Sequence, residues 1–107
     1  MARTEQLRLS PKATPRELER AYGQGLLRPD QLEHGAYYRG QCRVVEVARW
    51  HAHSRRFVYQ RDMRGTKHLD ELGHPDGGRT HDIFMPLERV EPAARQVLPD
   101  ELFERHA

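Results

Sequence analysis

The sequence predicts a small, mainly β protein of α+β character. We expect an SH3-like antiparallel barrel or a strongly bent sheet of 4–5 strands, with a short N-terminal helix and a C-terminal helical turn. Short strand-like runs recur at a spacing of about 8–12 residues with polar turns between them, and one of these runs alternates with period two. A chain of 107 residues with 36% hydrophobic and 32% charged residues has room for only one small core.

The centre of the prediction is the segment 35–63, which holds the only Trp, the only Cys and three of the four Tyr. Alternate positions from Tyr38 to Trp50 are mostly apolar, which predicts one long half-buried strand. Gly40 inside this strand predicts a bulge or a sharp bend. A basic turn over 51–55 then leads to a returning strand over 56–63.

The segments around this hairpin have their own signals. The polar and basic composition of residues 1–13 predicts a flexible arm, and we expect residues 14–107 to form a single domain. Within that domain we expect a helix over 14–22, a β core over 35–92 and a tail with helical turns over 93–107. Thr14, Pro15 and Glu17 supply the cap, first-turn proline and capping box of the helix.

Weaker signals complete the element list. A second short helical segment is expected within 26–34, near Pro29. A weak strand is expected over 66–72 and a final strand over 82–90. Pro86 restricts this last strand to a sheet edge or a bulge, because proline has no N–H to donate to a neighbouring strand.

The charge and the cysteine content limit the cellular environment and the classes of partner that we expect. The formal net charge is +2, with 16 Arg against 2 Lys, and the positive charge is concentrated before residue 57. Guanidinium groups suit recognition of phosphates and carboxylates. The single Cys42 and the absence of an apolar leader or span predict a soluble cytoplasmic protein.

Catalytic and metal-binding chemistry is the minority interpretation, so we predict a protein that is not an enzyme and has no cofactor. His51, His53, His74 and Asp76 are weak metal-ligand candidates without an established zinc spacing, and a metal-dependent hydrolase remains a third hypothesis. Cys42 lies on the apolar alternation, where a buried inert thiol is expected.

The arginine-rich face of the hairpin is the predicted partner surface. Basic and aromatic side chains alternate there, in a pattern typical of contacts with nucleic acid or with acidic protein surfaces. The candidate partner-binding residues are Tyr37, Arg39, Arg43, Arg49, Arg55, Arg56 and Arg61. Protein contact and direct nucleic-acid contact both remain open.

A family resemblance adds to this interpretation. The spacing of Leu32, Gly35–Arg43, Ala48–Trp50, Phe57, Arg61, His74–Asp76 and Asp82–Pro86 resembles a group of short uncharacterised proteobacterial proteins carried by plasmids and phages. The resemblance spans roughly residues 32–92 and carries no catalytic residues. It implies an accessory role on mobile elements, including inhibition of host defence systems such as CRISPR complexes. The resulting expectation is a non-catalytic binding module whose partner is a host protein or protein–nucleic-acid complex.

Overall fold

A computed structural model of the chain describes residues 14–42, 45–63, 66–73 and 84–106. Five antiparallel strands form one sheet in the order β4-β3-β2-β1-β5. The strands are β1 (Tyr37–Gln41), β2 (Val47–His51), β3 (Arg56–Met63), β4 (Thr66–Gly73) and β5 (Met85–Val90). The antiparallel α+β architecture predicted from sequence is therefore confirmed.

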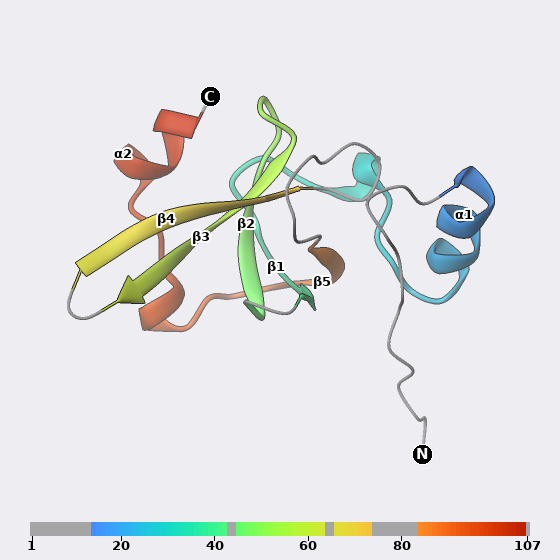
Figure 1. Ribbon diagram of the computed structural model, residues 1–107, viewed down its shortest axis with the longest axis horizontal. Coiled ribbons are helices and arrows are strands. Elements are labelled where there is room, and N and C mark those ends of the chain that lie inside the picture. The colour runs from blue at the N-terminus through green and yellow to red at the C-terminus, as the bar shows by residue number, and fades with distance from the viewer. Residues whose placement is uncertain (1–13, 43–44, 64–65, 74–83, 107) are drawn as a thin grey trace, which may run out of the picture.

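The sheet is open, so the predicted closed barrel is wrong. Among the described residues no pairing joins the edge strands β4 and β5. The reason lies in the register, because β2 pairs with only the first three residues of β3. The rest of the long β3–β4 hairpin extends past β2 and away from β5 (Figure 1). Closure requires the two edge strands to meet, and this hairpin carries β4 away from β5.

The predicted single strand over 38–50 is also corrected. It folds back on itself as β1 and β2, with Tyr38 paired to Ala48 and Arg39 to Val47. The apolar alternation continued through the connection because residues of both strands face the same core. Sequence periodicity alone does not distinguish one long strand from two short ones that share a face.

Gly40 and Pro86 lie opposite each other where the β1–β5 register shifts. The irregularity expected at Gly40 is present as a register shift in which Leu87 of β5 is the extra residue, and among the described strands the edge position of Pro86 is confirmed. A Cβ atom at Gly40 would lie 2.3 Å from the Met85 carbonyl oxygen, so the close backbone approach requires glycine. On the outer side of β5, the Leu27 N–H donates to the Pro86 carbonyl at 2.9 Å.

The main core lies on one face of the sheet. Trp50 is 2% exposed and packs against Phe57, whose ring also contacts Tyr38 and Phe84. A smaller cluster joins helix α1 (Pro15–Gly23) to β5 through Ala21, Leu26 and Met85. The predicted capping box is present, with Thr14 as the N-cap.

The second face is covered by the C-terminal segment. This segment contains the short 3₁₀ helix η2 (Ala94–Gln96), the α2 turn (Asp100–Phe103) and η3 (Glu104–His106). The predicted C-terminal helical turns are thus present, and another 3₁₀ helix, η1 (Pro29–Gln31), lies within the predicted 26–34 segment. Helices α1 and α2 lie at opposite ends of the molecule (Figure 1). None of the helices in the described ranges has the length and hydropathy needed to cross a bilayer.

Candidate functional site

Two of the predicted partner-binding residues hold the C-terminal segment on the sheet. The Arg49 guanidinium donates to the carbonyl oxygens of Gly35 at 2.8 Å and Leu98 at 3.0 Å, and to an Asp100 carboxylate oxygen at 2.7 Å. It also lies over the Phe103 ring, 4.1 Å from the centroid. The Tyr37 hydroxyl accepts the Leu98 N–H at 2.8 Å. This part of the arginine face is therefore occupied by the chain itself.

The other predicted contact residues are distributed along the same face and its turn. Arg39 pairs with Glu88 on the neighbouring β5, with Nε 2.7 Å from the carboxylate. Arg55 is exposed in the β2–β3 turn, and Arg56 is half-buried at the start of β3. Arg43 and the side chain of Arg61 lie outside the described residues.

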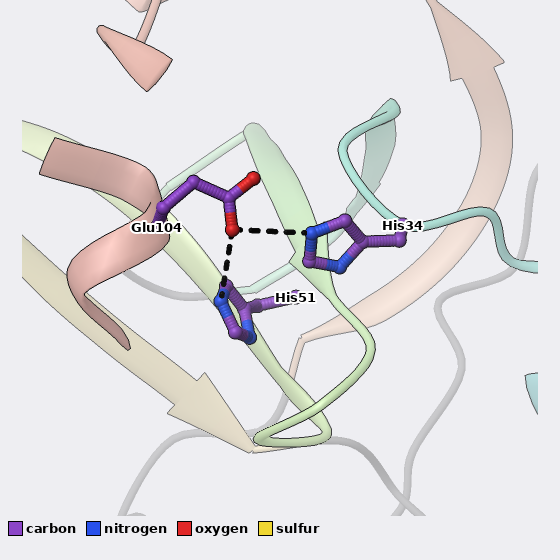
Figure 2. A group of neighbouring side chains, drawn as sticks. All are labelled: His34, His51 and Glu104. Carbon is purple, nitrogen blue, oxygen red and sulfur yellow. Dashed lines mark ion pairs between the residues drawn. The ribbon is translucent and has the colours of Figure 1, made fainter. Parts of the chain in front are cut away.

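Beside that turn, three side chains form what we call the His–Glu cluster: His34, His51 and Glu104. Their nearest ligand-type atoms all lie within 4.8 Å of one another. Glu104 Oε1 lies 3.5 Å from His34 Nε2 and 3.9 Å from His51 Nε2, as Figure 2 shows. His51 is fully buried at the end of β2, His34 comes from the loop before β1, and Glu104 belongs to η3.

Hydrogen bonds and ring contacts fix the orientation of both imidazoles. The Ala52 N–H donates to His34 Nδ1 at 3.0 Å, and the Ser54 N–H donates to His51 Nδ1 at 3.3 Å. A neutral imidazole whose Nδ1 accepts a hydrogen bond carries its proton on Nε2. Both Nε2 atoms therefore direct protons toward Glu104. The Phe103 ring packs on both imidazoles, with centroid separations of 5.2 and 4.8 Å.

The cluster differs from the metal group predicted from sequence. Of the four candidates, His51 is buried in the cluster, whereas His53 is exposed with its ring 5.0 Å from that of His34. His74 and Asp76 lie outside the described residues. Sequence reasoning missed His34 and Glu104, which are separated by 70 positions and approach only when the C-terminal segment docks. No local spacing signals such a pair.

Ser54 completes a Ser–His–acid order, since its hydroxyl lies 3.0 Å from His51 Nδ1 and Glu104 lies beyond Nε2. The same Nδ1 atom already accepts the backbone N–H of Ser54. A contact between residues three positions apart is typical of a short turn stabilised by a side chain. A catalytic base needs an available lone pair, and the lone pair of His51 Nδ1 is already used by the Ser54 N–H.

Cys42 is half-buried against the main core.

Comparison with known proteins adds no assignment: no protein-family model, curated protein or solved structure matches this chain.

Proposed function

We propose that this protein is a non-catalytic binding module that meets its partner through the β2–β3 turn, at His53, Arg55 and Arg56. The observation that carries the proposal is the backbone of Arg55, whose φ of 57° lies in the left-handed region. Glycine adopts this conformation without cost, whereas an L-residue with a side chain pays about 1–2 kcal/mol. The strained backbone places the exposed, cationic Arg55 side chain at the tip of the turn, and backbone strain of this kind clusters at binding sites.

The surroundings of the turn support the same proposal. The imidazoles of His34 and His51 accept N–H groups of Ala52 and Ser54, so the turn backbone is held on both sides. Because the backbone of the turn is already ordered, it loses little conformational entropy when its cationic tip binds a partner. The partner that best suits an arginine tip is an acidic protein surface or a phosphate backbone.

We propose a host protein or protein–nucleic-acid complex as the partner. The resemblance to accessory proteins of plasmids and phages favours inhibition of a defence complex, because a small module can block such a complex by occupying a surface. Because Arg49 contacts the C-terminal segment and Arg39 is paired with Glu88, the proposed contact surface is reduced from the whole arginine face to the turn. Direct nucleic-acid binding through the same turn is the alternative. Two of the four ligands on which the metal-dependent hydrolase hypothesis rests, His74 and Asp76, lie outside the described residues.

The test uses Arg55→Gly, which removes the side chain and relieves the left-handed backbone. We expect the variant to keep the wild-type fold, because glycine adopts a φ of 57° without strain, and its circular dichroism spectrum checks this. It should nevertheless lose the partner in affinity capture from a proteobacterial host lysate treated with nuclease. Arg95→Ser is the matched control, because Arg95 is exposed in η2 and its loss changes the net charge equally.

A partner recovered with the wild type and Arg95→Ser, and lost with Arg55→Gly, supports the proposal. Equal recovery by all three proteins rejects the turn as the contact surface. If recovery disappears after nuclease treatment, and a labelled single-stranded oligonucleotide binds with steep salt dependence, the alternative replaces the proposal.

A further inference from the structure

We propose that the His–Glu cluster binds one divalent transition-metal ion of the zinc type. In a tetrahedral zinc site with bonds of about 2.0–2.1 Å, neighbouring ligand atoms lie roughly 3.3 Å apart. The two Nε2–Oε1 separations of 3.5 and 3.9 Å are within about half an ångström of that value. The three ligand atoms all lie within 4.8 Å of one another, so the two imidazole nitrogens must also approach each other by up to about 1.5 Å before all three residues coordinate one ion.

The supports of the three ligands make this contraction feasible. His51 is fixed, since it is fully buried and packed by Phe103. His34 is on a loop and 31% exposed, and the Glu104 side chain is 58% exposed. One rigid ligand and two adjustable ones allow the bond lengths to be reached without moving the sheet. In Figure 2 all three side chains point toward a common centre.

Metal binding requires a change of tautomer, and its cost can be compared with the gain. An imidazole that coordinates through Nε2 carries its proton on Nδ1, so His34 would lose its hydrogen bond from the Ala52 N–H. His51 Nδ1 keeps one hydrogen-bond partner after this change, because the Ser54 hydroxyl beside it can accept a hydrogen bond as well as donate one. The Ser54 N–H nevertheless loses His51 Nδ1 as its acceptor, so two backbone hydrogen bonds are lost and together they reduce the affinity by roughly a hundredfold. The binding free energy of zinc sites in proteins exceeds a cost of this size, so Zn²⁺ binding through three ligands remains favourable.

The donor set selects the class of ion. Two imidazole nitrogens and one carboxylate oxygen suit Zn²⁺, Ni²⁺ or Cu²⁺, whereas Ca²⁺ and Mg²⁺ prefer oxygen ligands throughout. Three protein ligands leave one coordination position for water or for a nearby side chain. The ion would join three segments that are distant in sequence, namely the loop before β1, the end of β2 and η3. We therefore assign it a structural role in fastening the C-terminal segment.

The experiment uses the full chain, purified without a histidine tag and freed of metal with a chelator. Zn²⁺ is titrated by calorimetry, and Co²⁺ by its visible absorption, which reports the coordination geometry directly. We expect one equivalent of Zn²⁺ with a Kd below about 1 μM, a tetrahedral Co²⁺ spectrum and a rise in Tm of about 5 °C or more.

Variants separate this site from the other histidines of the chain. Glu104→Gln, which loses a ligand but keeps the side-chain volume, should weaken Zn²⁺ binding at least tenfold and abolish the Tm rise. Glu101→Gln is the matched control, because Glu101 is exposed one helical turn earlier and has no place in the cluster. Zn²⁺ binding weaker than about 100 μM by the wild type overturns the proposal, as does binding by Glu104→Gln equal to that by Glu101→Gln.

Discussion

Replacing Gly40 with alanine adds one methyl group at the tightest point of the sheet. The new Cβ would lie 2.3 Å from the Met85 carbonyl oxygen and 2.8 Å from two atoms of the Phe84 ring. Real Cβ atoms do not approach other heavy atoms to such distances. Because the nearest atom belongs to the backbone of β5, a side-chain rotation cannot relieve the clash.

The magnitude follows from what must move. Adding a methyl group to a well-packed core costs about 1–3 kcal/mol where neighbouring side chains can shift. Here β5 must separate from β1, and the fully buried Phe84 ring must move out of the main core. We therefore expect a loss of unfolding free energy of about 3 kcal/mol or more, at the upper end of that range.

Urea unfolding followed by the fluorescence of Trp50 measures this loss, since Trp50 is the only tryptophan and lies in the same core. Gly23→Ala is the internal control. A Cβ atom at Gly23 meets nothing within 4 Å and the residue ends α1, so that substitution should be neutral or stabilise by about 0.4–1 kcal/mol. If Gly40→Ala costs less than about 0.5 kcal/mol, the close approach of β1 and β5 is refuted.

Three further predictions concern the core, the C-terminal segment and the helix cap. Trp50→Ala should destabilise the protein by about 3–5 kcal/mol in urea unfolding, and a loss below about 1 kcal/mol would contradict its burial. Arg49→Met should cost about 2–4 kcal/mol because two partly buried carbonyl oxygens lose a charged donor. Asp100→Asn should cost under about 1 kcal/mol because the Asp100 side chain is 83% exposed, and equal losses would count against this division. The Thr14 backbone N–H holds the pKa of Glu17 below its usual value, so the cap contribution is complete at neutral pH and is lost as the pH falls through that lowered pKa. The protection factors of the α1 amides, which are exchange rates corrected for the intrinsic rate at each pH, should therefore fall on acidification in the wild type but not in Glu17→Gln. Identical profiles would exclude the cap as the cause.

Local signals in the sequence were sufficient for several elements. The cap of α1 depends on the side chains of Thr14 and Glu17, three residues apart, whereas the edge position of Pro86 and the register shift at Gly40 each depend on the backbone chemistry of one residue; all three features were predicted. The β2–β3 turn was also predicted, because its polar residues separate two apolar runs. Such features are set within a few residues and need no knowledge of the rest of the fold.

Long-range features were not predictable in the same way. The open sheet depends on how far β3 extends past β2, which the alternation of side chains does not encode. The structural role of Arg49 in holding the C-terminal segment was missed for a related reason. From sequence alone an arginine on a strand is expected to be exposed, and only the fold shows that the segment around Leu98 covers it. The pairing of His34 with Glu104 likewise arises only from docking.

The docking of the C-terminal segment has a consequence for biosynthesis. Arg49 and its acceptor at Leu98 are separated by 49 positions, so at about 5–20 residues per second the acceptor is made roughly 2–10 s after the arginine. Throughout that interval the face of the sheet that carries Arg49 lacks the C-terminal segment, whose Phe103 contacts Arg49 and His51 in the finished protein. The unfinished chain therefore passes through a stage that favours chaperone binding or premature association, and translation speed after β5 becomes a determinant of yield.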